Sequence, residues 1–226
     1  MRGLVLSLFP GADLWGMAFE AEGFYVVRGP DILLGGDVRK WHAIPGKFDG
    51  IIGGPPCKSF SKACKGQVAT EGNLIPEFER IVKESVANWW VMENVPQAPV
   101  PEGAMWSGVY DAWWFGSEQH RSRRFSSNLA LNPVLLEPSE RHPDPFPCVT
   151  ATECKYNGSP RDRRRAGRKL GRQLTLLEMN RLMGLPEDFE TPALLMEKAY
   201  AVRGNGVPLQ MGRALARAVI NNFYQQ

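Results

Sequence analysis

Three short stretches of this sequence carry side chains that could do chemistry, and each follows an apolar run. The first is Gly53-Gly-Pro-Pro-Cys57, where two prolines stiffen the backbone and two glycines permit close approach. Cys57 stands beside Lys58, and cationic surroundings raise the thiolate fraction of a cysteine. An inert core cysteine does not need this rigid setting, so the pattern favours a nucleophile.

The second stretch is Val91-Met-Glu93-Asn-Val-Pro96, which places a carboxylate where a buried strand ends. Burial raises the pKa of a carboxyl group and suits it to proton donation. A carboxylate that only caps a turn is the alternative for Glu93.

The third stretch is Gln119-His-Arg121-Ser-Arg123. In a strand, alternate residues lie on one face, so these three long side chains would line up together. Two guanidinium forks on one face suit the recognition of phosphate or base oxygens. An exposed, basic edge strand is the alternative.

The elements that must position these residues form a regular series. Short apolar runs alternate with helical patterns, and the strands are expected at 3–9, 24–27, 48–52 and 89–92, the helices at 13–22 and 75–88. This alternation predicts a doubly wound α/β fold with a parallel sheet, and such sheets bind ligands at the carboxyl ends of their strands.

The pattern changes after residue 125. Prolines and a basic run mark residues 126–172 as a small, loop-rich lobe, distinct from the catalytic part at 1–125. Residues 173–226 are expected to return to the catalytic part. A capping box of Thr175 and Glu178 starts one helix there, and a last helix opens at 206–208.

Composition is that of an ordinary folded chain, with 226 residues, 43% apolar and 23% charged. No run approaches the 18 apolar residues of a membrane span, and the apolar N-terminus is expected to be a buried strand. The four cysteines form no CxxC pair, which argues against a disulfide scaffold and a structural zinc site and favours a reducing, cytoplasmic setting.

The positive charge is concentrated in one part of the chain. Net charge is +3, but residues 119–172 hold 12 basic and 5 acidic residues, so they carry +7. Such a block suggests a surface that faces a polyanion. A solvated loop is the alternative.

The stretches taken in order resemble the DNA (cytosine-5)-methyltransferases that use S-adenosylmethionine. The similarity spans nearly the whole chain and rests on PhePxGly (9–11), Gly-Asp-Val (36–38), Gly-Gly-Pro-Pro-Cys (53–57), Glu-Asn-Val (93–95), QxRxR (119–123), LTxxE…RLMGLPEDF (174–189) and GNGVP (204–208). It implies a Rossmann-like methyltransferase sheet with a small target-recognition lobe.

The resemblance also implies catalytic roles. Cys57 matches the nucleophile that adds to C6 of the target cytosine, and Glu93 the acid that contacts N3 and the exocyclic amine. Arg123 matches the residue that meets O2, with Arg121 beside it in a positioning or phosphate-binding role.

A second set of residues is expected around the cofactor, S-adenosylmethionine. Phe9, Gly11 and the returning segment with Asn205 and Val207 match the family's pocket. The set comprises Phe9, Gly11, Asp13, Asp31, Asp37, Pro55, Leu74, Asn205 and Val207. The family's first motif usually begins with Asp, but Ser7 stands here, and the carboxylate for the ribose hydroxyls is either Asp31 or Asp13.

The implied partner is double-stranded DNA, bound by a monomer without metal or membrane, in a bacterial or phage-infected cell. Reaching C6 requires that the cytosine leave the duplex, and residues 58–73 match the loop that closes over it. Residues expected at the DNA are Lys58, Ser59, Ser61, Gln119, Thr150, Arg163, Arg164 and Arg165. Because the lobe is small, a short or relaxed target sequence is expected.

Two alternatives stay open. Some relatives of this family modify cytosine in transfer RNA, and the same cysteine and glutamate would serve there. A catalytically inactive DNA-binding relative is the other, supported by the altered first motif.

Overall fold

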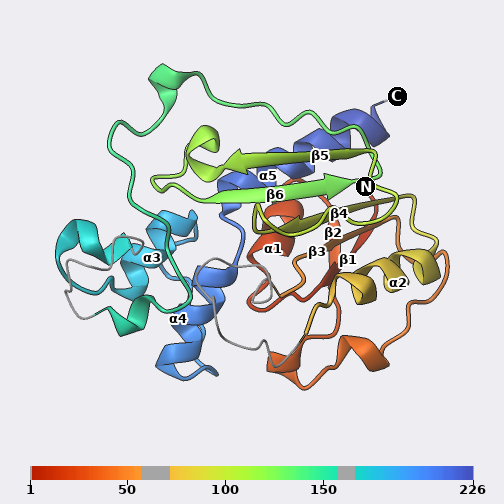
Figure 1. The fold of residues 1–226 in the computed structure, drawn as a ribbon, viewed down its shortest axis with the longest axis horizontal. Helices are drawn as coiled ribbons and strands as arrows, with labels where there is room; N and C mark the ends of the chain where they lie inside the picture. The colour runs from red at the N-terminus through yellow and green to blue at the C-terminus, as the bar shows by residue number, and fades with distance from the viewer. Residues whose placement is uncertain (1, 57–71, 157–165, 226) are drawn as a thin grey trace.

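The structure is a computed structural model that describes residues 2–56, 72–156 and 166–225 (Figure 1). A six-stranded sheet forms its centre, and a smaller helical part lies beyond one end of the strands. None of the helices in the described ranges has the length and apolar character that a membrane crossing needs.

The sheet has the strand order β2-β1-β3-β4-β6-β5. Its strands are β1 (Leu4–Leu8), β2 (Tyr25–Arg28), β3 (Gly50–Gly53), β4 (Trp89–Asn94), β5 (Trp106–Asp111) and β6 (Ser122–Ser127). The first four run parallel, as predicted, whereas β6 runs antiparallel to both β4 and β5. The predicted α/β class is confirmed, and β5 is an element that the sequence pattern did not reveal.

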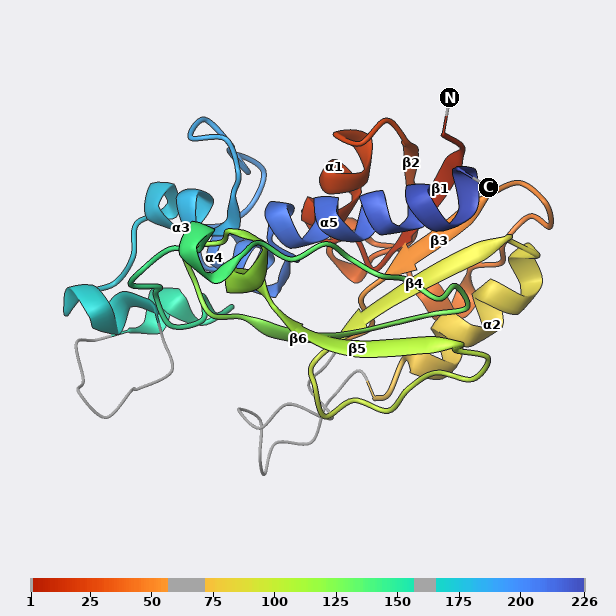
Figure 2. The ribbon, with the colours of Figure 1, turned by 90° about the horizontal axis from the view of Figure 1, so that it is seen from above.

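Helices cover both faces of the sheet (Figure 2). One face packs against α1 (Leu14–Glu20) and α5 (Leu209–Val219), and the other against α2 (Ile75–Ser85). Successive strand residues point to opposite faces, so Trp89 joins the first of these cores and Trp90 the second. A strand buried on both sides is therefore apolar throughout, which explains the continuous runs in the sequence.

The helical part at the carboxyl ends of the strands contains α3 (Leu176–Met183) and α4 (Met196–Asn205). The predicted capping box is confirmed, because the Thr175 hydroxyl accepts from the Glu178 backbone N–H while the Glu178 carboxylate accepts from that of Thr175. The sequence pattern did not predict α4, and the last helix begins at Leu209, after the predicted start.

Both ends of the described chain lie at the end of the sheet where the parallel strands begin (Figure 2). After α5 the chain makes a π-helical turn, Ile220–Tyr224. The Tyr224 hydroxyl accepts a hydrogen bond of 3.3 Å from Nε1 of Trp89, which is the first residue of β4. The cavity described next is at the opposite edge.

Candidate active site

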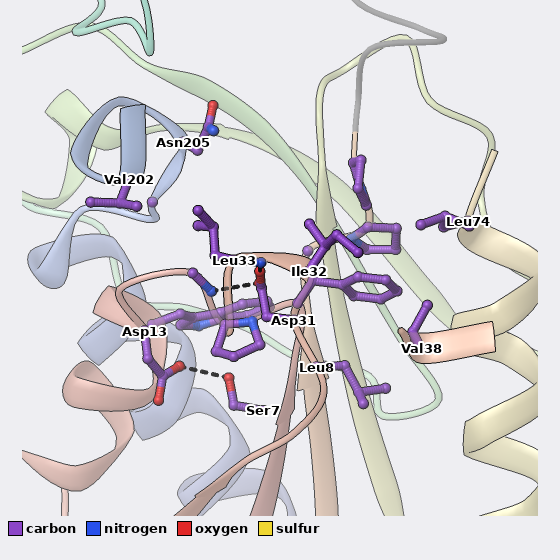
Figure 3. A pocket seen from close by; sticks show the side chains of 18 of the residues that line it. Ser7, Leu8, Asp13, Asp31, Ile32, Leu33, Val38, Leu74, Val202 and Asn205 are labelled. Atoms are coloured by element: carbon purple, nitrogen blue, oxygen red, sulfur yellow. Dashed lines mark hydrogen bonds between the residues drawn. The ribbon is translucent and has the colours of Figure 1, made fainter. Parts of the chain in front are cut away.

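A cavity of about 590 Å³ opens at the carboxyl ends of the parallel strands (Figure 3). Its walls come from the residues that follow β1, β2 and β3, from the end of β4 and from α4. It is lined by Glu93 and Arg123 and by all nine residues expected at a cofactor: Phe9, Gly11, Asp13, Asp31, Asp37, Pro55, Leu74, Asn205 and Val207. The fold thus brings two predicted groups of residues into one cavity.

Glu93, which is buried, and Arg123, which is half-buried, form an ion pair that lines this cavity. The register of β4 and β6 pairs Glu93 with Phe125, so Arg123 lies two residues along the neighbouring strand. Nε of Arg123 is 2.8 Å from Oε1 of Glu93, and Glu93 is only 8% exposed. The pair can present an acid and a guanidinium side by side to a planar polar ligand.

Burial sets the acidity of Glu93. Removal from water disfavours the carboxylate and raises the pKa of Glu93 above its ordinary value, although the positive charges of Arg123 and Arg121 act in the opposite direction. A carboxyl group with a raised pKa keeps its proton to a higher pH and can donate it to a ring nitrogen.

The backbone that leads to Cys57 runs alongside this acid. A Cβ placed on Gly54 would lie 3.0 Å from Oε2 of Glu93, so glycine is what permits this close approach. Nδ2 of Asn94 donates to the Pro55 carbonyl at 3.1 Å and fixes the next residue. Cys57 itself lies outside the described residues, as do Lys58, Ser59 and Ser61.

The two candidate carboxylates for the ribose differ in their surroundings (Figure 3). Asp31 follows β2 and is half-buried at the cavity, where its Oδ2 accepts from the Gly11 backbone N–H at 2.9 Å. Asp13 is turned toward Ser7 and is only 2% exposed. Its Oδ1 accepts from the Ser7 hydroxyl at 2.6 Å and from the Gly16 N–H at 3.1 Å, which makes it the N-cap of α1. This geometry favours Asp31.

Burial also perturbs Asp13. Removal from water raises the pKa of Asp13 from 3.8 to about 6, although the Ser7 hydrogen bond and the Arg28 charge lower it. Arg28 Nε lies 3.1 Å from Asp13 Oδ2. Ser7 and Asp13 together therefore form a hydrogen-bonded unit at the first turn.

Asp37, one of the residues expected around the cofactor, is held by Arg39. Its Oδ1 accepts from the backbone N–H and Nε of Arg39 at 3.1 and 2.9 Å, and its Oδ2 from Nη2 at 2.9 Å. The Arg39 guanidinium holds the pKa of Asp37 below its ordinary value. Each carboxylate oxygen accepts about two hydrogen bonds, so one site on Oδ2 remains for an incoming amine.

Three predictions for the QxRxR stretch are wrong. β6 begins only at Ser122, so Gln119 does not share a strand face with Arg123. Gln119 is fully buried, and its amide donates to the Leu182 carbonyl and accepts from the Val149 N–H, so it is not placed to contact DNA. Arg121 is 1% exposed and binds backbone carbonyls, which contradicts a phosphate-binding role.

The sequence matches a family model described as C-5 cytosine-specific DNA methylase over residues 7–101 and 147–221. These two ranges make up most of the chain. The chain belongs to this family.

Curated relatives of this family member include three type II methyltransferases. M.AquIA of Picosynechococcus sp. is 49% identical in an alignment of 122 residues that covers 42% of this chain and 49% of the relative. M.NgoPII of Neisseria gonorrhoeae is 32% identical over 40% of this chain and 33% of the relative, and M.HindV of Haemophilus influenzae is 25% identical over 76% and 75%. The matches to M.AquIA and M.NgoPII thus span half or less of those relatives' own length.

Solved structures of similar fold cover nearly the whole methylase chain. A DNA modification methyltransferase encoded within a prophage (E. coli) superposes with a TM-score of 0.69 at 15% identity, covering 98% of this chain and 99% of its own. The Entamoeba histolytica methyltransferase EhMeth superposes with a TM-score of 0.65 at 12% identity, covering 98% of both chains. At these identities the likeness shows the fold.

The remaining predicted DNA contacts of the methylase have different outcomes. Arg163, Arg164 and Arg165 lie outside the described residues. Thr150 is half-buried, and its hydroxyl lies 3.4 Å from Oε2 of Glu153. Its contact with DNA stays a prediction.

The sequence patterns did not predict several of the residues that line the cavity. Ile32 and Leu33 follow Asp31, and Arg39 follows Asp37, so each lies next to a predicted residue. Lys198, Ala201 and Val202 lie on α4 with the predicted Asn205 and form one face at helical spacing, but this face mixes polar and apolar residues and gives no amphipathic signal in the sequence. In the described ranges no group of three or more His, Cys, Asp or Glu side chains could hold a metal ion.

Proposed function

We propose that this protein transfers a methyl group from S-adenosylmethionine to C5 of a cytosine flipped out of duplex DNA, with Cys57 as the nucleophile. The observation that carries the proposal is the Glu93–Arg123 ion pair, which lines the same cavity as Asp31 and Asp37. A target base and a methyl donor could therefore bind side by side in this one cavity.

The residues of the cavity fit S-adenosylmethionine. A volume of about 590 Å³ is within the range typical of cofactor sites. Phe9, Ile32 and Leu74 offer apolar surface to an adenine ring, while Asp31 and Asp37 offer carboxylate oxygens to hydroxyl and amino donors. When bound, the cofactor supplies an electrophilic methyl group on a positively charged sulfur.

The residues of this chain would then handle the base. The Cys57 thiolate forms a bond to C6, and the electron pair of the C5–C6 double bond shifts to C5, which takes the methyl group. Loss of the C5 proton to a base or water restores the double bond and expels the thiolate. Protonated Glu93 stabilises the ring at N3, and Arg123 faces O2.

The basic part of the chain supports a nucleic acid as substrate. We assign residues 1–125 to catalysis, 126–172 to target recognition and 173–226 to closure of the cofactor site. Thr150 and the arginines at 163–165 would contact the DNA backbone, along with the residues that follow Cys57. With a lobe this small, few base edges can be read, so the target sequence is short.

Covalent trapping tests the proposal. Duplex DNA that carries 5-fluorocytosine, incubated with the protein and S-adenosylmethionine, is expected to yield a covalent adduct, because fluorine at C5 cannot leave as a proton. Cys57→Ser should abolish the adduct, whereas Cys154→Ser, at a half-buried cysteine in the lobe, should retain it.

The substrate is tested in the same assay. Methyl incorporation from labelled cofactor should be found in duplex DNA and not in transfer RNA. Adducts that persist in Cys57→Ser, or incorporation into transfer RNA alone, would each contradict the proposal. Bisulfite mapping of the methylated DNA then gives the target, and a strict site of six or more base pairs would contradict the short-target prediction.

A further inference from the structure

Arg121 connects three segments that are far apart in the sequence. Its Nη1 donates to the Val149 carbonyl at 2.8 Å, and its Nη2 donates to the carbonyls of Gly204 and Gly206, each at 2.9 Å. The side chain is only 1% exposed. One guanidinium thus binds three backbone carbonyls, of which that of Val149 also accepts from the Cys148 thiol at 3.2 Å.

The acceptors of Arg121 flank residues of the candidate active site. Gly204 and Gly206 stand on either side of Asn205, and Asn205, Gly206 and Val207 all line the cavity. Val149 precedes Thr150, whose backbone packs so closely on Gly204 that a Cβ there would collide with it. The wall of the cavity and the segment returning from the lobe are therefore joined at this one side chain.

We propose that Arg121 is a positioning residue for the cofactor, which holds the Gly204–Gly206 segment in the shape that closes the pocket around S-adenosylmethionine. This inference rests on the proposed function. Of the two roles expected for Arg121, positioning and phosphate binding, it specifies the first, and it assigns to Arg121 no contact with DNA or with the reacting atoms.

The shape of the guanidinium explains why arginine suits this position. Its planar fork presents several N–H donors at fixed angles, and a hydrogen bond from a charged donor is stronger than one from a neutral group. Methionine keeps much of the length and none of the donors. It would remove the guanidinium from the carbonyls of Gly204 and Gly206 and leave the Val149 carbonyl with only the Cys148 thiol. Lysine keeps the charge but concentrates its donors at one atom, so it should restore part of the effect.

Arg203 provides a matched control. It is also 1% exposed, and its guanidinium donates to the carbonyls of Ala199 and Phe189 and to the Asn180 side chain. Those partners belong to α3, α4 and the loop between them, and Arg203 does not line the cavity. Loss of the Arg203 guanidinium should disturb the packing of α3 and α4 without changing the positions of the Gly204 and Gly206 carbonyls.

The experiment compares Arg121→Met, Arg121→Lys, Arg203→Met and the wild-type protein. Calorimetry gives the Kd of S-adenosylhomocysteine without DNA, and thermal unfolding of each variant identifies a temperature at which all are folded. We expect Arg121→Met to raise the Kd by about tenfold or more, Arg121→Lys to fall between it and wild type, and Arg203→Met to change the Kd by less than about threefold.

Two results would overturn the inference while leaving the proposed function intact. One is a wild-type Kd in folded Arg121→Met. The other is an equal loss of affinity in Arg203→Met and Arg121→Met. That result would mean that cofactor affinity depends on any buried arginine near α4, and not on the hydrogen bonds of Arg121 to Gly204 and Gly206. A wild-type protein that binds no S-adenosylhomocysteine would instead overturn the proposed function and this inference with it.

Discussion

Replacement of Asp13 by asparagine tests how the first turn is held. Asp13 is a buried carboxylate that accepts from the Ser7 hydroxyl and the Gly16 N–H and caps α1. Asparagine keeps an acceptor oxygen of the same reach but has no charge to titrate. The variant therefore removes one ionisation and preserves the cap.

The size of the effect follows from the raised pKa. Folding shifts the pKa of Asp13 from 3.8 to about 6, so between these values the folded protein binds a proton that the unfolded chain does not. The contribution of Asp13 to stability is therefore complete below pH 3.8 and is lost as the pH rises through about 6. The full shift corresponds to about 3 kcal/mol, of which about 2 kcal/mol falls between about pH 4.5 and pH 7.5.

Urea unfolding at a series of pH values measures this contribution. The free energy of unfolding of wild type minus that of Asp13→Asn should fall by about 2 kcal/mol from pH 4.5 to pH 7.5, since titrations common to both proteins cancel. Ser7→Ala should move the midpoint of the wild-type transition to higher pH, because it removes a hydrogen bond that lowers the pKa of Asp13. A flat difference, or one that rises with pH, would refute the reasoning.

Three further predictions concern the cavity and its closure. Arg123→Gln removes a charge that lowers the pKa of Glu93, so the high-pH limb of kcat/KM for methyl transfer should move to higher pH; a shift to lower pH would contradict this. Asp31→Asn replaces a charged acceptor by a neutral one, so it should raise the Kd of S-adenosylhomocysteine, measured by calorimetry, by about tenfold. An unchanged Kd would mean that Asp31 does not bind the cofactor. Gly204→Ala forces a Cβ into the Thr150 backbone and should cost about 1–3 kcal/mol of stability in urea unfolding. An unchanged free energy of unfolding in Gly204→Ala would contradict this close packing.

Local patterns were sufficient to predict much of the sheet. The strands at β1, β3 and β4 are buried on both faces, so their apolar runs are continuous and easy to recognise. β5 escaped notice because Ser107 and Gly108 interrupt it, one of its faces is only half-buried and the other is exposed. α4 escaped because Glu197, Lys198 and Gly204 lie among its apolar residues and leave no clear stripe.

Motif order located the cavity, but tertiary contacts decided the task of each residue. Asp13 and Asp31 both follow a strand. Only the hydrogen bond from the Ser7 hydroxyl shows that the Asp13 carboxylate is used inside the protein, which leaves Asp31 for the cofactor. Arg121 and Arg123 are two residues apart, and yet one binds backbone carbonyls and the other Glu93. Those partners are up to 85 positions away in the sequence, beyond the reach of any local pattern.

The position of the two chain ends has a practical consequence. Gly3 and Tyr224 lie against each other at the end of the sheet where the parallel strands begin. Both chain ends are therefore on the side of the protein opposite the cavity. A fluorescent protein or a programmable DNA-targeting module tethered at either end would start from the rear of the enzyme. If the proposed function holds, linker length would then limit which cytosines the tethered protein can reach.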